Sequence, residues 1–252
     1  MASFKDKEAD MKLVYKKADG LDLPLWVFLP DTDIHNARTV LLIHGGGWND
    51  AIKDNSEWNG GWMCNNARYL CENGFIAIVI SYRSLMVSEE LNVGNLLEDC
   101  QDAVAYIKEH LKFVSFDDTV YMGDSAGGYL VTMLGLGEDC PPAVVSLNPV
   151  LGLLDTKWKY GFNNCDIKSL TPVHNVGGKC SDFLFMHGTG DTVVEIEYTR
   201  ELNDLLRDKG YKSELIEIPE AQHAFVLYNY KYPDDYVTKI MDNIIDYIKK
   251  NF

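Results

Sequence analysis

Short, almost wholly apolar runs recur along the chain, and longer amphipathic stretches lie between them. Runs such as TVLLI, FIAIVIS and FLFMH are rich in β-branched and aromatic residues, which is typical of strands buried on both faces of a sheet. The amphipathic stretches have the spacing of helices that pack on one side. The pattern predicts strands at residues 12–15, 23–29, 39–43, 75–81, 119–122, 143–147, 183–187 and 213–218, and helices at residues 59–73, 92–112, 128–136, 194–209 and 234–251.

Strands and helices alternate through most of this pattern. Such alternation favours an α/β fold with a mostly parallel central sheet of about eight strands and helices on both faces. Residues 18–20 read Ala-Asp-Gly between the first two strands, which predicts an opening antiparallel hairpin. We interpret the irregular stretch 148–180 as a small insertion that shapes the substrate pocket. No linker or repeat is visible, so residues 1–252 are expected to form a single domain.

Composition and charge narrow the classes of function. Hydrophobic residues make up 46% of the chain and aromatic residues 12%, and the formal net charge is −15. No basic stripe is visible, which argues against nucleic acid or an anionic membrane as a partner. The charged N-terminal stretch lacks the apolar segment of a signal peptide, and no apolar run reaches the ~20 residues of a membrane span. We therefore expect a cytoplasmic protein.

The cysteines point to the same compartment. They show neither a C-x-x-C pair nor the spacing of metal ligands, and no metal site is expected. We interpret them as reduced thiols, mostly buried. The six residues are Cys64, Cys71, Cys100, Cys140, Cys165 and Cys180.

A candidate nucleophile follows the predicted strand at residues 119–122. Residues 123–127 read GDSAG, and strand, turn and helix together form the G-x-S-x-G nucleophile-elbow pattern. A Cβ atom at either glycine would strike the neighbouring strand or helix, and the tight turn is expected to strain the backbone of Ser125. The first N–H groups of the following helix would then face a negative charge that develops beside the serine.

Two further polar residues follow the ends of later strands. Asp191 lies in a glycine-flanked loop after the strand at 183–187, and His223 lies in the loop after the last strand. The carboxyl ends of parallel strands meet at one edge of a sheet, where ligands bind. A histidine can remove the proton of a serine hydroxyl, and a carboxylate can orient the imidazole. The order Ser125, Asp191, His223 therefore predicts a nucleophile, an acid and a base.

Other residues compete for the last two roles. The competing acids and bases are Asp155, Asp166, Asp182, His44, His174 and His187. We prefer Asp191 because it directly follows a strand inside a glycine-flanked loop. We prefer His223 because it alone follows the last strand, and we interpret His44 as a residue that orients the adjacent glycine loop by hydrogen bonding.

Four motifs together resemble those of the α/β-hydrolase superfamily. They are HGGGW at 44–48, GDSAGG at 123–128, HGTGDTVV at 187–194 and QHAF at 222–225. More narrowly, the chain resembles the HGGG-type carboxylesterases, which include hormone-sensitive-lipase-like enzymes and small bacterial feruloyl and acetylxylan esterases. The resemblance implies the α/β-hydrolase fold and ester hydrolysis through an acyl-enzyme, without metal or cofactor.

The resemblance also implies where the transition state would be held. An oxyanion hole would be formed by the backbone N–H groups of Gly46, Gly47 and Ala126. Trp48 and Phe225 adjoin the motifs and are candidates to line the acyl or alcohol pocket. The long N-terminal helical cap of the larger lipase-like members has no counterpart here, which favours an open site for short acyl groups.

The leading prediction is a serine carboxylesterase that acts on short-chain acyl esters, with acetyl or feruloyl esters of carbohydrates preferred. An arylformamidase or a small peptidase is the alternative enzyme, because amide and ester cleavage use the same triad. A non-catalytic ligand-binding protein, such as the plant hormone receptors that resemble this family, is a further alternative. Those receptors lack the catalytic histidine, and His223 speaks against that hypothesis. The expected partner is a small-molecule ester, and the oligomeric state is left open.

Overall fold

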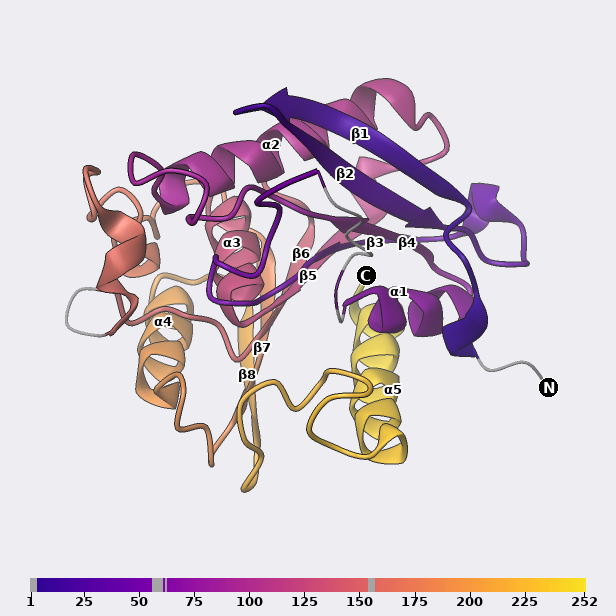
Figure 1. Ribbon diagram of the computed structural model, residues 1–252. Coiled ribbons are helices and arrows are strands. Elements are labelled where there is room, and N and C mark those ends of the chain that lie inside the picture. The colour runs from indigo at the N-terminus through magenta and orange to yellow at the C-terminus, as the bar shows by residue number, and fades with distance from the viewer. Residues whose placement is uncertain (1–3, 56–60, 62, 154–156) are drawn as a thin grey trace.

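The computed structural model describes residues 4–55, 61, 63–153 and 157–252, which are built around one twisted sheet (Figure 1). The strand order is β1-β2-β4-β3-β5-β6-β7-β8. β2 pairs antiparallel with β1 and with β4, and the other neighbours pair in parallel. The predicted mostly parallel sheet is confirmed. Its strands are β1 Met11–Ala18, β2 Leu21–Phe28, β3 Thr39–Ile43, β4 Ile76–Ile80, β5 Thr119–Asp124, β6 Ala143–Leu147, β7 Asp182–Gly188 and β8 Ser213–Ile218.

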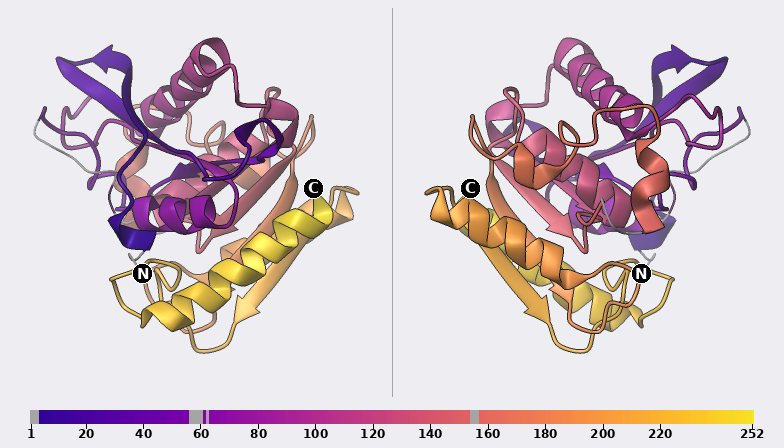
Figure 2. Two further views of the ribbon diagram at one scale, coloured as in Figure 1. Left: turned by 90° about the vertical axis from the view of Figure 1, so that its right-hand side faces the viewer. Right: turned by 90° about the vertical axis from the view of Figure 1, so that its left-hand side faces the viewer.

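Helices cover both faces of this sheet, as predicted. α2, α3 and α4 pack on one face and contribute to one buried cluster, whereas α1 and α5 contribute to a second cluster on the other face. Figure 2 shows α4 and α5 on opposite sides of the strands. Within the described residues, the α-helices are α1 Met63–Glu72, α2 Val93–His110, α3 Ser125–Gly135, α4 Ile196–Asp208 and α5 Asp234–Asn251.

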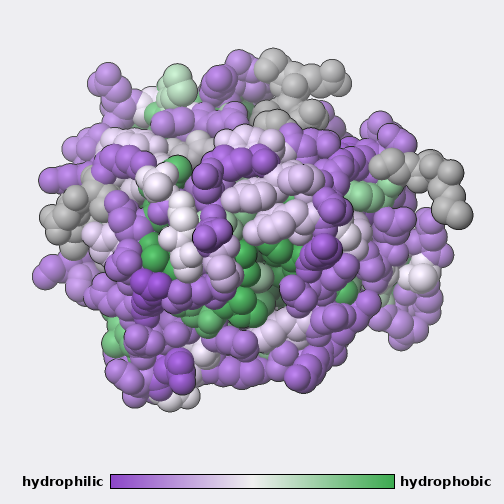
Figure 3. Space-filling model, turned by 90° about the horizontal axis from the view of Figure 1, so that it is seen from below, coloured by the Kyte–Doolittle hydropathy of each residue, from purple (hydrophilic) through white to green (hydrophobic). Residues whose placement is uncertain are grey.

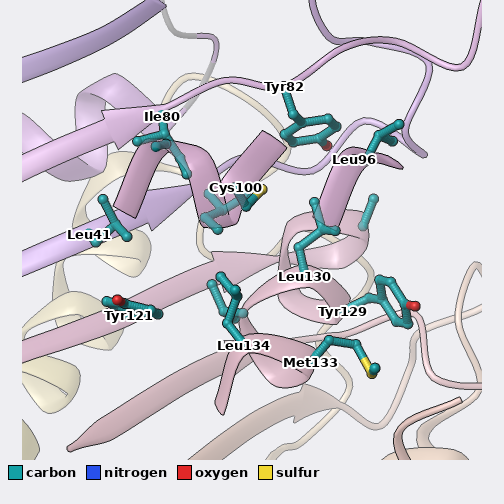
Figure 4. Packing of buried hydrophobic residues seen from close by; sticks show 14 of the residues in the cluster. Leu41, Ile80, Tyr82, Leu96, Cys100, Tyr121, Tyr129, Leu130, Met133 and Leu134 are labelled. Atoms are coloured by element: carbon teal, nitrogen blue, oxygen red, sulfur yellow. The ribbon is translucent and has the colours of Figure 1, made fainter. Parts of the chain in front are cut away.

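The apolar runs form strands because both of their faces are buried. Successive side chains of a strand point to opposite faces, so Leu41 of β3 joins the cluster on the α2 side while Val40 and Leu42 join the cluster on the α1 side. Figure 4 shows the first cluster, in which Leu41 and Tyr121 from the strands face Leu134 of α3 and its neighbours. All 11 residues of α3 are buried, which fixes this helix firmly beneath the end of β5.

The element boundaries differ from the prediction at a few points. The helix expected at 59–73 is α1, but residues 59, 60 and 62 lie outside the described residues. α3 begins at Ser125, three positions before the expected start, because the elbow leads directly into the first helical turn. Gly74 has a φ of +90° and ends α1, as its lack of a Cβ atom allows.

The remaining expectations concern the irregular segment, the cysteines and the membrane. The stretch 148–180 contains two short 3₁₀ helices, Lys157–Phe162 and Pro172–His174, and residues 154–156 lie outside the described part. All six cysteines are free thiols, but only three of them are buried, which is fewer than the predicted majority. Within the described residues, no helix combines the length and the apolar character needed to cross a bilayer.

Candidate active site

The turn between β5 and α3 holds Ser125 in a strained conformation. The φ of Ser125 is +53°, a value that non-glycine residues rarely adopt outside functional sites. A Cβ atom on Gly123 would lie 2.4 Å from the carbonyl oxygen of Gly127, and one on Gly127 would lie 2.1 Å from that of Ile43. Both glycines are therefore required by close backbone approach, in agreement with the sequence interpretation. The strain projects the serine side chain from the tip of the turn.

Ser125, His223 and Asp191 form one continuous line of hydrogen bonds. Nε2 of His223 lies 2.8 Å from Oγ of Ser125, and Nδ1 of His223 lies 2.7 Å from Oδ2 of Asp191. An ionised carboxylate only accepts hydrogen bonds, so the imidazole proton belongs on Nδ1 and Nε2 is free to accept the serine proton. The three residues lie just beyond the carboxyl ends of β5, β7 and β8. This is the edge of the sheet at which the sequence predicted a site.

Asp191 is held from several sides. Its Oδ1 accepts hydrogen bonds from the N–H groups of Val193 at 2.8 Å and Val194 at 3.0 Å. Its Oδ2 lies 3.3 Å from Nε2 of His187 as well as beside His223. Burial acts to raise the pKa of Asp191, but the hydrogen bonds from His187 and His223 outweigh it and lower that pKa. The carboxylate is therefore ionised at neutral pH.

The contact between His187 and Asp191 was not predicted from the sequence. The imidazole of His187 is fully buried, with Nδ1 2.9 Å from Oγ1 of Thr199 and Nε2 3.2 Å from the carbonyl oxygen of Val194. The available signal was its spacing of four residues from Asp191 in the same loop motif. The competing acid Asp182 instead forms a salt bridge with Lys212 at the start of β7, and Asp155 lies outside the described residues.

A glycine loop follows β3 and faces Ser125 across the site. His44, at the start of the loop, is buried. Its ring stacks on that of Tyr82, with 4.6 Å between the ring centroids. Its Nδ1 lies 2.8 Å from the carbonyl oxygen of Gly45, and its Nε2 lies 3.0 Å from Oγ of Ser81. Burial lowers the pKa of His44 to about 4, against the hydrogen bond to Gly45 and the charge of Asp50. His44 is thus a neutral residue that fixes the loop.

Asp124 connects the glycine loop to the elbow. Its Oδ1 accepts a hydrogen bond of 2.9 Å from the N–H group of Gly45, and a Cβ atom on Gly45 would lie 2.7 Å from its Oδ2. Burial raises the pKa of Asp124 to about 6, against the charge of His223 and this hydrogen bond. In the sequence, the only signal for this role of Asp124 is its position directly before Ser125. The φ angles of +101° at Gly46 and +59° at Gly47 then turn the loop towards the serine.

A cavity of about 270 Å³ opens over the serine. Gly46 and Gly47 line it, and among the described residues their N–H groups donate no hydrogen bond. Figure 3 views the face at which β7 and β8 end and shows apolar residues gathered in a hollow within a hydrophilic rim. Besides this loop, the elbow and His223, the wall includes Asp50, Met63, Trp158, Val193, Leu227 and Tyr230.

The two predicted pocket residues lie elsewhere. Trp48 is fully buried, and its Nε1 donates a hydrogen bond of 3.3 Å to the carbonyl oxygen of Ala126. Phe225 is also fully buried and belongs to the core cluster on the α1 side of the sheet. Neither lines the cavity, because both rings turn inward to bury their area in the core. Trp158, from the irregular segment, supplies an aromatic wall instead.

Comparisons with known proteins agree with this architecture. Residues 25–143 match the family model BD-FAE. A curated relative, the probable carboxylic ester hydrolase LipM of Mycobacterium tuberculosis, is 25% identical, and the match covers 84% of this chain and 54% of that protein. The chain therefore spans about half the length of this relative.

Solved structures of esterases are similar over nearly the whole chain. The apo form of Thermogutta terrifontis esterase 2 has a TM-score of 0.80 at 22% identity, covering 96% of this chain and 94% of that one. The propionate-bound form of the same enzyme has a TM-score of 0.79 at 23% identity, with coverages of 94% and 92%. Together with the sheet order, these likenesses show that the chain has the α/β-hydrolase fold.

Proposed function

We propose that the protein is a serine carboxylesterase that hydrolyses short-chain acyl esters through an acyl-enzyme intermediate. The observation that carries this proposal is the hydrogen-bonded line from Asp191 through His223 to Ser125 on the wall of the cavity. The names of the curated relative and of the structural neighbours support an ester as the substrate.

Acylation follows from this geometry. As Oγ of Ser125 attacks the ester carbonyl, Nε2 of His223 accepts its proton across the 2.8 Å hydrogen bond. The ionised Asp191 keeps the imidazole in the required tautomer and stabilises the imidazolium. The proton then passes to the leaving alcohol. Water, deprotonated by the same imidazole, attacks the acyl-enzyme and releases the acid.

The oxyanion of each tetrahedral intermediate would be held by the backbone N–H groups of Gly46, Gly47 and Ala126. Gly45 cannot serve, because its N–H group already donates to Asp124. Ala126 is in the first turn of α3, where N–H groups lack partners within the helix. Donors of this kind typically contribute about 3–4 kcal/mol each to transition-state stabilisation.

The cavity and the irregular segment bear on the substrate. A volume of about 270 Å³ suits a short acyl chain, and a structural neighbour has been solved with butyrate bound. We propose that residues 148–180 are a pocket-shaping insertion in a single domain, because Trp158 lines the cavity and the hydroxyl of Tyr160 donates to the carbonyl of Gly47. Carbohydrate-borne acetyl or feruloyl groups are our preferred natural substrates, on the resemblance alone.

A substrate panel tests this function. The panel contains p-nitrophenyl esters of increasing chain length, acetylated and feruloylated oligosaccharides, and N-formylkynurenine, each assayed for kcat/KM. We expect the highest values among short-chain esters, and a preference for the acylated sugars if the finer proposal holds. Hydrolysis of the formamide far faster than any ester would replace the esterase with an arylformamidase. No hydrolysis of any member would contradict the enzyme proposal itself.

A further inference from the structure

Asp50 is a charged residue on the wall of the cavity that the proposed reaction does not use. It follows the glycine loop, and its backbone N–H group donates a hydrogen bond of 3.0 Å to the carbonyl oxygen of Gly46. A Cβ atom on Gly46 would lie 2.7 Å from the Cβ atom of Asp50. Asp50 is therefore packed against the backbone that carries the proposed oxyanion donors.

The carboxylate of Asp50 is not neutralised by the protein. Its side chain is exposed, and within the described part of the chain it forms neither an ion pair nor a hydrogen bond. Of the described residues that line the cavity, none is a lysine or an arginine. The loop itself is closed by the backbone N–H group of Asp50, so the carboxylate is not needed to hold the turn.

The charge of Asp50 acts on its surroundings. It raises the pKa of the buried His44, in opposition to the larger effect of burial. The other carboxyl group on the cavity wall belongs to Asp124, so it cannot compensate the negative charge of Asp50. An unpaired charge beside a partly enclosed cavity repels like charges and attracts opposite ones over a distance of about 10 Å at moderate salt.

We propose that Asp50 is a specificity-determining residue that restricts the substrate to esters whose groups are uncharged or positively charged. This inference rests on the proposed esterase function and narrows its substrate class. Two unit charges a few ångströms apart in a solvent-exposed site change an equilibrium or a rate by roughly threefold to tenfold. Anionic esters are discriminated against by charge repulsion rather than by shape, and such repulsion is one of the means by which a binding site excludes a wrong ligand.

The same charge favours departure of the product. Water adds to the acyl carbon, the bond from that carbon to Oγ of Ser125 breaks, and the serine recovers its proton from His223. The released carboxylic acid loses its own proton to the solvent and becomes an anion. This anion lies in the same cavity as the carboxylate of Asp50, so its affinity is lowered while that of the neutral ester is not.

A matched pair of acetate esters tests the substrate class. Acetylcholine and 3,3-dimethylbutyl acetate have the same shape, but only the first carries a positive charge. We expect Asp50→Asn to lower the ratio of their kcat/KM values threefold to tenfold, and the effect to shrink between 10 mM and 500 mM salt. Asp117→Asn is the control, because Asp117 is exposed just before the amino end of β5, at the opposite edge of the sheet from Ser125. It removes the same charge and should leave the ratio unchanged.

Binding of butyrate tests the inference without catalysis. We expect its dissociation constant, measured by ligand-observed NMR in the Ser125→Ala background, to fall at least threefold when Asp50→Asn is added. If wild type hydrolyses no ester but butyrate binding responds in this way, the esterase proposal fails, whereas the repulsion of anions from the cavity by Asp50 stands. An unchanged ester ratio together with unchanged butyrate affinity, or equal shifts in the Asp117→Asn variant, would overturn the role of Asp50.

Discussion

The carboxylate of Asp191 is held by contacts at both of its oxygen atoms. Its Oδ1 is occupied by two backbone N–H groups, which leaves Oδ2 for the imidazoles of His187 and His223. Burial alone would favour the protonated acid, but these hydrogen bonds lower the pKa of Asp191. The carboxylate therefore remains charged where an ionised acceptor is needed to orient His223.

The first prediction concerns this acceptor. Asp191→Asn keeps the size of the side chain but offers an N–H donor or a neutral acceptor to His223, so the tautomer that accepts the serine proton is no longer enforced. We expect kcat for ester hydrolysis to fall by about 10⁴, by analogy with serine proteases. Asp182→Asn is the matched control, because its salt bridge with Lys212 is partly exposed at the other end of β7. A larger loss in the control than in Asp191→Asn would contradict the assignment.

Two other buried titratable residues have pKa values shifted in opposite directions. Burial lowers the pKa of His44 to about 4 and raises that of Asp124 to about 6. Between about pH 4 and pH 6, His44 takes up a proton in the unfolded state but stays neutral in the folded state. Acidification therefore lowers the free energy of unfolding. Over the same range, Asp124 takes up a proton in the folded state but not in the unfolded state, and this uptake raises the free energy of unfolding. The two contributions are expected to offset one another in the wild type.

The second prediction separates the contributions of His44 and Asp124 to the pH dependence of the unfolding free energy. Asp124→Asn retains an oxygen for the N–H group of Gly45 but removes the stabilising proton uptake. On acidification from pH 7 to pH 4, this variant should lose about 2–3 kcal/mol more unfolding free energy than the wild type, at about 1.4 kcal/mol per unit of pKa shift. Urea titrations across this range measure the difference. An equal loss in both proteins would show that Asp124 does not take up its proton in the folded state.

At the scale of elements, the elbow depends on backbone atoms that approach too closely for any side chain. Gly127 of α3 lies against the end of β3, where a Cβ atom would meet the carbonyl oxygen of Ile43 at 2.1 Å. The helix cannot move away, because all of its residues are buried. The packing of α3 on β3 and β5 is thus what keeps Ser125 strained and facing the cavity.

The third prediction uses two glycines of the same region. Gly127→Ala should destabilise the protein by about 3 kcal/mol or more, since the contact cannot be relieved by a side-chain rotation. Gly137→Ala is the control, because its added Cβ atom would lie 3.5 Å from the nearest heavy atom, an ordinary contact, and should change stability by less than about 1 kcal/mol. Equilibrium unfolding measures both. Similar stabilities for the two variants would contradict the account of the elbow.

Sequence patterns predicted the elements well and the directions of side chains less well. The strand at 39–43 was correct in both bounds, because its threonine and four apolar residues lie directly between Arg38 and His44, which leaves little freedom. Asp191 and His223 could be chosen as candidates because each follows the end of a strand, and the structure places both in one hydrogen-bonded line with Ser125. Trp48 was assigned wrongly to the pocket, since adjacency to a motif does not decide whether a ring turns towards the cavity or the core. The contact of His187 with Asp191 depends on the fold of the loop and had only its spacing as a signal.

At the scale of the whole molecule, one sheet edge brings together loops that lie far apart in the sequence. The glycine loop after β3, the elbow after β5 and the loops after β7 and β8 all reach the same cavity. The irregular segment adds Trp158 to its wall. The limited volume of about 270 Å³ leaves little apolar wall for a long chain.

The fourth prediction follows from that volume. Each CH₂ group that finds an apolar contact contributes about 0.8 kcal/mol, and groups beyond the wall contribute nothing. We expect kcat/KM for p-nitrophenyl esters to be highest from acetyl to butyryl and to fall beyond roughly six to eight carbons. Activity that rises steeply towards chains of ten or more carbons would show that a longer pocket exists.

The role of Ser125 as the nucleophile is the central claim, and covalent labelling tests it most directly. Intact-protein mass spectrometry after treatment with paraoxon should show one diethylphosphoryl group on the wild type, located by peptide mapping to Ser125, with parallel loss of ester hydrolysis. Paraoxon phosphorylates the structurally similar Thermogutta terrifontis enzyme. Ser125→Ala should remain folded by circular dichroism, take up no label and lack activity. Label on another residue, or wild-type turnover in Ser125→Ala, would contradict the account.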